Sequence, residues 1–388
     1  MKKIKYLSLI LTFVVMFCCG LVISPQNEIV VNAIKPDLIK SKAYCLMDSQ
    51  TGEVLLENNS NQHLPIASVT KTMTLLLVFE AIEQNKFGLN DLLLSSKNAS
   101  GMGGSQVFLE ADTKYKADDL LYAVVMSSAN DASVVFAEEI AGSEDAFVDM
   151  MNDKAKQLGL TDTHFSNCTG LPANDHYSSA KDVALIMREL IKYPAYFNYT
   201  KERLRDFVHP TGRITQMTNT NKLINAYKGC DAGKTGSTVE AGYCLSATAM
   251  RNNMRLISVV LGADNSKQRF ADCATIFDYG FNNYQSICLV NKDEQELYPN
   301  KILHAKTNEI VVKPSCSYYE ITPKNEDSKT TIIRQYDNVS APLKAGDVVG
   351  QIVVLENGVV KHQIDLILVC DVEQKTLLDD IREISNKW

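Results

Sequence analysis

The sequence Ser68-Val-Thr-Lys71 opens an apolar stretch that continues to Glu83 with the spacing of an α-helix. Leu64-Pro65 comes before it and stops any preceding element, so the pattern predicts a long helix with Ser68 in its first turn. Residues three apart on a helix share a face, which places the Ser68 hydroxyl beside the Lys71 ammonium. A serine hydroxyl needs a base within hydrogen-bonding reach to act as a nucleophile, so the pair indicates covalent catalysis. Taken alone, the pair also fits a helix-capping serine and a solvated lysine.

Two further short motifs follow in order, Ser128-Ala-Asn130 and Lys234-Thr-Gly236. The first lies in a polar break between two predicted helices, where the Ser128 hydroxyl can relay a proton and the Asn130 amide can bind a substrate carbonyl. On a strand, Lys234 and Gly236 share one face and Thr235 lies on the other. If Lys234 packs beside Lys71, its charge and burial both lower the pKa of Lys71, which can then act as a base.

Backbone amides complete the predicted site. A helix N-terminus at Ser68 leaves N–H groups free to bind an oxyanion, and the N–H of Ser237 is the second predicted donor. Gly236 allows a substrate backbone to come close, so a peptide would lie along this strand as an added strand. Taken singly, the first motif also fits a helix cap, the second a turn and the third an edge strand. The three together describe a serine acyl-transfer site with a lysine base and no histidine.

The first residues have the pattern of a secretory signal peptide. Lys2, Lys3 and Lys5 precede an uncharged run over residues 6–23, and Val31-Asn32-Ala33 offers a cleavage site. We expect residues 1–33 to be a signal peptide that is cleaved after Ala33, and the mature protein to be exported. The alternative is an uncleaved anchor, because the run is close to the shortest length that spans a bilayer.

Composition argues against several classes of function. Removing residues 1–33 takes away three Lys and one Glu, which leaves 36 basic and 45 acidic residues and a net charge of −9. Such a surface argues against nucleic-acid binding. The six His and the eight remaining Cys residues are widely spaced, so we expect no metal site and no cofactor. We interpret the cysteines as buried free thiols, although an exported protein can also pair them.

Residues 34–285 are predicted to form an α+β domain. Strands are expected at residues 43–48, 53–57, 233–237, 242–250 and 254–263. Helices are expected at residues 68–83, 118–126, 131–140, 145–158, 179–190 and 269–279. Because the helices are inserted between an N-terminal hairpin and a C-terminal meander, we expect an antiparallel sheet flanked by helices, with a helical lobe.

Residues 286–372 are predicted to form a second, small all-β domain of sandwich type. Its β-rich runs are residues 309–313, 330–334, 348–355 and 359–368. Asn357-Gly358 separates the last two runs and is a strong signal for a two-residue hairpin turn.

Residues 373–388 have the pattern of an amphipathic helix. One helical stripe carries Leu377, Leu378, Ile381, Ile384 and Trp388. One interpretation is peripheral contact with a membrane through residues 375–388, with Trp388 at the interface. The other is a helix that packs back on the protein, because the acidic residues of the opposite face would be repelled by anionic lipids.

The three motifs belong to a wider pattern that includes the residues around them and segments elsewhere in the chain. It comprises Pro65–Lys71, Ser127–Ala132, Met151-Asn152, Lys156–Gly159, Thr163–Asn167, Gly170-Leu171, Lys234–Thr238, Ala241–Tyr243, Pro342–Gly346 and Val349-Gly350. With these residues, nearly the whole mature chain resembles the serine-type D-alanyl-D-alanine carboxypeptidases, the low-molecular-mass penicillin-binding proteins. The resemblance implies a β-lactamase/transpeptidase-like fold followed by the family's C-terminal β-domain.

The resemblance also implies an activity and a place of action. The protein would remove the terminal D-Ala from peptidoglycan stem pentapeptides through an acyl-enzyme on Ser68, and β-lactams would acylate the same residue. It would work in the cell wall or at the outer face of the cytoplasmic membrane. The implied catalytic residues are Ser68, Lys71 and Ser128. The implied substrate-binding residues are Asn130, Lys234, Thr235, Gly236, Ser237 and Arg269, the last as a grip for the terminal carboxylate.

Three alternative functions share some of these features. A class A-like β-lactamase needs a Glu in an E-x-x-L-N string to activate water, and Glu202–Asp206 does not supply it. Ser68 is therefore expected to accept a β-lactam readily and to release it slowly. A non-catalytic penicillin-binding module should have lost Ser68, Lys71 or Lys234, and all three are present. A peptidoglycan endopeptidase stays open.

Overall fold

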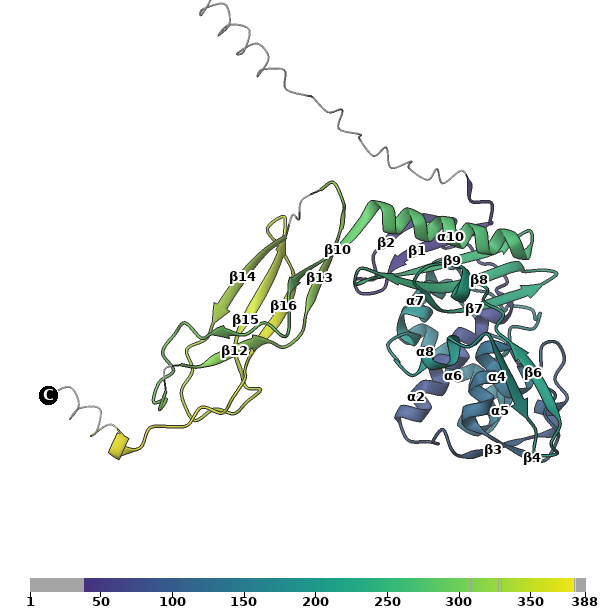
Figure 1. Ribbon diagram of the computed structural model, residues 1–388, viewed down its shortest axis with the longest axis horizontal. Coiled ribbons are helices and arrows are strands. Elements are labelled where there is room, and N and C mark those ends of the chain that lie inside the picture. The colour runs from purple at the N-terminus through teal and green to yellow at the C-terminus, as the bar shows by residue number, and fades with distance from the viewer. Residues whose placement is uncertain (1–37, 308, 327, 329, 380, 382–388) are drawn as a thin grey trace, which may run out of the picture. The chain divides into compact units, whose positions relative to one another are not determined.

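The computed structural model describes residues 38–307, 309–326, 328, 330–379 and 381 (Figure 1). The predicted signal peptide and half of the predicted tail helix, residues 380 and 382–388, lie outside the described residues. In the part of the chain that is described, no helix is both long enough and apolar enough to cross a bilayer.

A five-stranded antiparallel sheet organises the N-terminal domain, with strand order β2-β1-β9-β8-β7. The strands are β1 (Ala43–Asp48), β2 (Val54–Asn58), β7 (Cys230–Thr238), β8 (Gly242–Arg251) and β9 (Met254–Ala263). The hairpin β1–β2 and the meander β7–β8–β9 agree with the sequence prediction. Because β7 is the last strand of this order, one side of its backbone has no strand partner in the sheet.

Helix α10 (Ser266–Asn283) covers one face of this sheet. It is longer at both ends than the predicted residues 269–279, because the Asn265 side chain accepts the N–H of Gln268 and caps an earlier start. Gly280 allows the helix to lie close to the strands. A Cβ atom at this position would come within 2.5 Å of Leu256 Cδ1 and 2.8 Å of Leu46 Cδ2.

The helical lobe lies on the other face of the sheet (Figure 1). Its longer helices are α2 (Lys71–Glu83), α4 (Ala117–Met126), α5 (Asn130–Ala141), α6 (Glu144–Gln157) and α7 (Ala180–Leu190). The short ones are α3 (Lys97–Ser100), α8 (Tyr196–Thr200) and α9 (Leu223–Ala226). Ten of the 13 residues of α2 are buried, so this helix runs through the core of the domain. Two pairs of antiparallel strands were not predicted. The first pairs β3 (Leu92–Ser95) with β4 (Thr113–Lys116), and the second pairs β5 (Leu204–Val208) with β6 (Ile214–Thr218).

The C-terminal domain is all-β, as predicted. A five-stranded sheet has the order β11-β12-β16-β15-β14, with β11 (Glu296–Leu297), β12 (Val311–Pro314), β14 (Thr330–Tyr336), β15 (Val348–Glu356) and β16 (Val359–Leu368). A two-stranded sheet pairs β10 (Tyr284–Val290) with β13 (Tyr318–Pro323), and neither strand was predicted. Asn357 and Gly358 both have positive φ, 51° and 79°, and form the predicted turn between β15 and β16.

The eight described cysteines are all free thiols, but only five of them are buried. Cys288, Cys316 and Cys370 of the C-terminal domain are exposed, so the expectation of buried thiols is wrong for these three. Cys288 lies in β10, whereas Cys316 and Cys370 lie in the connections that follow β12 and β16, and widely spaced cysteines do not indicate which of them face the solvent.

Candidate active site

Ser68 lies in a short 3-10 turn (Ala67–Thr70) that leads directly into α2, rather than in the first turn of the α-helix itself. Ser68 keeps partial solvent exposure, whereas Lys71 is fully buried. Lys71 Nζ lies 3.0 Å from Ser68 Oγ, so the two side chains share a hydrogen bond. The tighter turn therefore preserves the pairing that helical spacing predicts.

The ammonium of Lys71 is held by neutral acceptors. Nζ donates to Asn130 Oδ1 at 2.6 Å and to the backbone oxygen of Thr169 at 2.6 Å. Burial is the main cause that lowers the pKa of Lys71 from 10.5 to about 7. A large fraction of Lys71 is then uncharged at neutral pH, which gives the amine a free lone pair next to the Ser68 hydroxyl.

Ser128 and Lys234 form a second hydroxyl–amine pair in the same site. Lys234 Nζ donates to Ser128 Oγ at 2.8 Å and to the backbone oxygen of Thr235 at 2.9 Å. Ser128 adopts a left-handed conformation with φ of 61°, in the break between α4 and α5. Burial, followed by the charges of Lys71 and Arg269, holds the pKa of Lys234 well below its usual value.

Asn130 joins the two pairs to the loop that precedes β4. Its Oδ1 accepts from Lys71, while its Nδ2 donates to the backbone oxygen of Gly103 at 2.7 Å. The next residue, Asp131, accepts the N–H groups of Val107 and Leu109 at 3.1 Å each. The start of α5 therefore fixes both the Asn130 amide and one wall of the site.

Strand β7 brings the third motif against the turn that carries Ser68. A Cβ atom at Gly236 would lie 2.7 Å from Ile66 O and 2.9 Å from Ser68 N, so only glycine allows this approach. Thr235 Oγ1 donates to Thr220 Oγ1 at 2.8 Å, and Ser237 is exposed. The backbone N–H groups of Ser68 and Ser237 belong to the two segments that Gly236 brings together.

Arg269 reaches the same strand from the first turn of α10. Its Nη1 donates to the backbone oxygen of Gly236 at 3.0 Å, and the guanidinium lies over the Phe270 ring at 4.8 Å. The side chain is buried, and its Nε has no hydrogen-bond partner among the described residues. A buried guanidinium thus supplies positive charge behind the Lys234–Gly236 segment.

A second set of residues, which no sequence pattern predicts, holds the turn before Ser68. Ala67 has a strained φ of 47°, and its carbonyl oxygen accepts the Thr70 hydroxyl at 2.8 Å. Thr70 Oγ1 lies 2.7 Å from Nε2 of the buried His176, whose Nδ1 accepts the N–H of Ser166 at 3.0 Å. Since Nδ1 must be unprotonated to accept, Nε2 carries the proton and donates to Thr70.

Gly170 packs against the carbonyl oxygen of Ala67. With φ of 83°, it passes so close to Ala67 that a Cβ atom would lie 2.0 Å from the Ala67 oxygen. The Gly170-Leu171 pair in a turn-rich stretch was the one available signal for this contact. Its partner lies about 100 residues earlier, so spacing could not reveal it.

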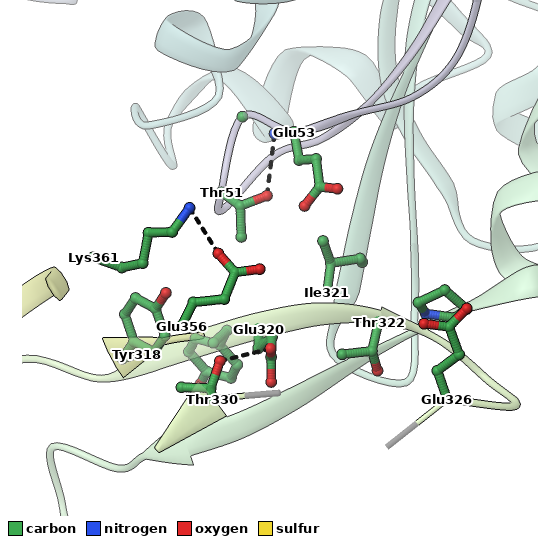
Figure 2. Close-up of a pocket in the computed structure, with 13 residues that line it drawn as sticks. Thr51, Glu53, Tyr318, Glu320, Ile321, Thr322, Glu326, Thr330, Glu356 and Lys361 are labelled. Carbon is green, nitrogen blue, oxygen red and sulfur yellow. Dashed lines mark hydrogen bonds and ion pairs between the residues drawn. The ribbon is translucent and has the colours of Figure 1, made fainter. Parts of the chain in front are cut away.

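Figure 2 shows a different cavity, lined by Thr51, Gly52 and Glu53 of the β1–β2 turn and by residues of the C-terminal domain, to which none of the three motifs contributes. Two of its glutamates have side-chain partners: Lys361 Nζ lies 2.7 Å from Glu356 Oε2, and Thr330 Oγ1 donates to Glu320 Oε1 at 2.7 Å. No nucleophile–base pair lines this cavity among the described residues.

Comparisons with known proteins agree with this architecture. Residues 30–265 match the family D-alanyl-D-alanine carboxypeptidase, and residues 284–374 match penicillin-binding protein 5, C-terminal domain. D-alanyl-D-alanine carboxypeptidase DacF of Bacillus subtilis is 37% identical over 354 residues, which cover 90% of each chain.

Solved structures are also similar. A peptidoglycan synthesis regulatory factor (PBP3) from Streptococcus pneumoniae matches with a TM-score of 0.72 and 28% identity, over 86% of this chain and all of that one. Penicillin-binding protein D2 from Listeria monocytogenes, in its ampicillin-bound form, matches with a TM-score of 0.56 and 31% identity, over 63% of this chain and 98% of that one.

Fold and site together define a serine acyl-transfer enzyme of the penicillin-binding class. Within that class, the chain belongs to the D-alanyl-D-alanine carboxypeptidase family, and it is a serine D-Ala-D-Ala carboxypeptidase. The predicted fold class and the predicted family are therefore confirmed.

Proposed function

We propose that Ser68 is the nucleophile that removes the terminal D-Ala from peptidoglycan stem pentapeptides, with Lys71 as its base. The observation that carries this assignment is the 3.0 Å contact between Ser68 Oγ and the buried Lys71 Nζ, whose pKa burial lowers to about 7. Neutral Lys71 takes the hydroxyl proton as Oγ attacks the carbonyl carbon of the penultimate D-Ala. The N–H groups of Ser68 and Ser237 then bind the oxyanion.

Collapse of the tetrahedral intermediate requires a proton on the departing amine. Ser128 relays this proton to the leaving D-Ala, and its hydrogen bond with Lys234 at 2.8 Å keeps the relay in place. The C–N bond breaks and the acyl group stays on Ser68 Oγ. Water then attacks the ester, which restores Ser68 and releases the shortened peptide.

The remaining motif residues bind the substrate. The free edge of β7 accepts the peptide as an added strand along Thr235, Gly236 and Ser237. The positive charge of Arg269, which lies next to Gly236, attracts the terminal carboxylate of the peptide. The Asn130 amide donates a hydrogen bond to a substrate carbonyl.

β-Lactams carry a similar acyl group and would acylate Ser68. The test is incubation with fluorescent penicillin followed by intact mass measurement. The wild-type protein should gain the mass of one β-lactam, and Ser68→Ala should gain none. Ser49→Ala, a serine in the β1–β2 turn, is the matched control and should label like wild type. Equal labelling of Ser68→Ala and wild type would refute the assignment.

The same site predicts slow release of the β-lactam, because the chain has no E-x-x-L-N string to supply a deacylating carboxylate. A D-Ala release assay on an uncross-linked pentapeptide and on a cross-linked dimer would separate carboxypeptidase from endopeptidase action.

We also propose a division into a signal peptide (1–33), a peptidase domain (34–285), a β-domain (286–372) and a tail (373–388). The family matches at residues 30–265 and 284–374 support the two central boundaries. Export to the cell wall or to the outer face of the cytoplasmic membrane would follow from cleavage after Ala33. Mass spectrometry of the secreted protein should give Ile34 as the first residue.

The tail is proposed to contact the membrane surface peripherally. Its described apolar residues Leu377, Leu378 and Ile381 are 76%, 68% and 53% exposed, which supports a partner outside the chain rather than packing on it. Vesicle co-sedimentation of the full mature chain and of a chain ending at Val372 would test this, and equal sedimentation of both would refute it.

A further inference from the structure

A buried carboxylate follows directly after Asn130, at the start of α5. Asp131 is 0% exposed, and none of the three motifs includes it. Its oxygens accept the N–H groups of Val107 and Leu109 at 3.1 Å each and of Ala132 at 2.9 Å. A buried carboxylate is tolerated only where hydrogen bonds satisfy it. The backbone that carries Val107 and Leu109 is therefore matched to this side chain.

The segment that Asp131 holds has no helix or strand of its own. Residues 106–110 lie outside regular secondary structure, and Phe108 has a positive φ of 64°. Such a conformation is strained for a residue other than glycine and persists only where the surroundings hold it. A second hold comes from β6, where Thr215 Oγ1 donates to the Val107 oxygen at 3.2 Å.

The residues just before this segment fix the Asn130 amide. The Asn130 N–H donates to the Ser105 oxygen at 2.7 Å, and Nδ2 donates to the Gly103 oxygen at 2.7 Å. Because Nδ2 has two hydrogens, one remains for a substrate carbonyl while Oδ1 accepts from Lys71. Gly104 packs against the same amide, since a Cβ atom there would lie 2.8 Å from Nδ2. A shift of Gly103 would free the amide to rotate and would take an acceptor from Lys71.

The charge of Asp131 also acts on the amine of Lys71. Burial lowers the pKa of Lys71 to about 7, and the negative charge of Asp131 opposes this shift. Cys168 also faces Lys71, but burial raises the pKa of this thiol, which stays uncharged. His176 is neutral because burial lowers its pKa to about 4, and Lys234 has its own pKa lowered, first by burial and then by the charge of Lys71. Removing the charge of Asp131 should therefore lower the pKa of Lys71 further.

The other titratable groups around Asp131 come from β4 and from the β5–β6 pair. Burial raises the pKa of Tyr115 and lowers that of His209, so both are uncharged near neutral pH. Arg213 lies 3.6 Å from Glu110, and these two charges offset one another. A pH effect of removing the Asp131 charge is therefore assigned to Lys71.

We propose that Asp131 is a positioning residue of the acyl-transfer reaction. It ties residues 103–109 to the start of α5, and this segment holds the Asn130 amide between Lys71 and the substrate. The inference rests on the proposed roles of Lys71 and Asn130 and adds a residue that lies outside the three motifs.

The test is Asp131→Asn in the mature protein, which keeps the shape of the side chain but removes its charge and one acceptor. We expect kcat/KM for D-Ala release from an uncross-linked pentapeptide to fall about 10- to 100-fold, because small displacements of catalytic groups are costly. The rising limb of the pH profile of kcat/KM should also move to lower pH, which a purely structural role would not cause.

Asp48→Asn is the matched control. Asp48 is 1% exposed and accepts the N–H groups of Gln50 and Thr51 in the β1–β2 turn, so it loses similar hydrogen bonds away from the site. This variant should keep the wild-type kcat/KM and pH profile.

Hydrogen exchange of the wild-type protein adds a test that does not depend on the folding of a variant. The amides of Val107 and Leu109 should exchange at least about 100-fold more slowly than those of an unstructured chain, because Asp131 holds them. Exchange at the unprotected rate would overturn the proposal.

The kinetic outcomes separate this inference from the assignment of the nucleophile. A wild-type kcat/KM in Asp131→Asn, an unshifted pH limb, or an equal loss in Asp48→Asn overturns the positioning role of Asp131 while Ser68 remains the nucleophile. D-Ala release that survives Ser68→Ala would instead overturn the proposed nucleophile.

Discussion

Lysines of the two domains respond to their surroundings in opposite ways. In the peptidase domain, Lys71 and Lys234 are buried, donate to neutral oxygens, and have lowered pKa values. In the β-domain, Lys361 and Lys306 are exposed and paired with Glu356 and Glu373, whose hydrogen bonds raise the pKa of each lysine. The same side chain is thus a candidate base where it is desolvated and a fixed cation where it is solvated.

The comparison also separates stability from function. Buried amines without a carboxylate partner lower the stability of a domain, so their presence indicates a chemical role. Exposed ion pairs such as Lys361–Glu356 contribute little and can be changed freely. Matched substitutions of equivalent residues in the two domains therefore separate a chemical role from a structural one.

The largest effect is expected for Lys71→Met, which keeps the length of the side chain and removes the amine. We expect the rate of acylation by fluorescent penicillin to fall about 10³-fold or more, because Ser68 loses its base. Lys361→Met in the β-domain should acylate within about twofold of wild type. A Lys71→Met protein that keeps its thermal melt and reacts within tenfold of wild type would show that Lys71 is not the base.

The next effect concerns two glycines with similar positive φ, Gly170 at 83° and Gly358 at 79°. Gly170→Ala places Cβ against the Ala67 oxygen, so we expect a loss of about 3 kcal/mol or more in the free energy of unfolding. Gly358→Ala meets no atom within 4 Å and should cost only about 1 kcal/mol, the conformational penalty alone. Equal losses in urea denaturation would contradict the account of the turn before Ser68.

A smaller effect is expected for Thr70→Val, which removes the hydroxyl that connects His176 to the Ala67 carbonyl. The buried groups left without partners should cost about 1–3 kcal/mol, and kcat should fall as Ser68 loses its fixed position. Thr70→Ser should restore both values, whereas Thr330→Val in the β-domain should change stability by about 0.5 kcal/mol or less. Wild-type kcat in Thr70→Val would refute a positioning role for Thr70.

The sequence predicted those parts of the molecule that depend on local patterns. Strands β8 and β9, helix α7 and the Asn357-Gly358 turn each follow from spacing or turn chemistry within a few residues. Strands β10 and β13 were missed because Tyr284–Val290 and Tyr318–Pro323 lack the sustained alternation of apolar and polar residues that predicts a strand.

The site could be predicted only in part, for a related reason. Short motifs identify Ser68, Lys71, Ser128 and Lys234 because their chemistry restricts the residue types. The left-handed turn at Ala67 instead depends on contacts with Gly170 and, through Thr70, with His176. Such contacts arise only when distant segments pack together, so no local pattern encodes them.

The central claim is that a buried, uncharged Lys71 activates Ser68, and the pH dependence of acylation tests it most directly. Because the pKa of Lys71 is lowered to about 7, the amine is protonated and inactive below this pH and free above it. The acylation rate should rise about tenfold per pH unit between pH 5 and 6.5, then level off above about pH 8, with an apparent pKa that belongs to the Lys71–Lys234 pair. Lys361→Met should give the same profile. A rate that stays constant from pH 5 to 8.5, or that begins to rise only near pH 10, would contradict the account.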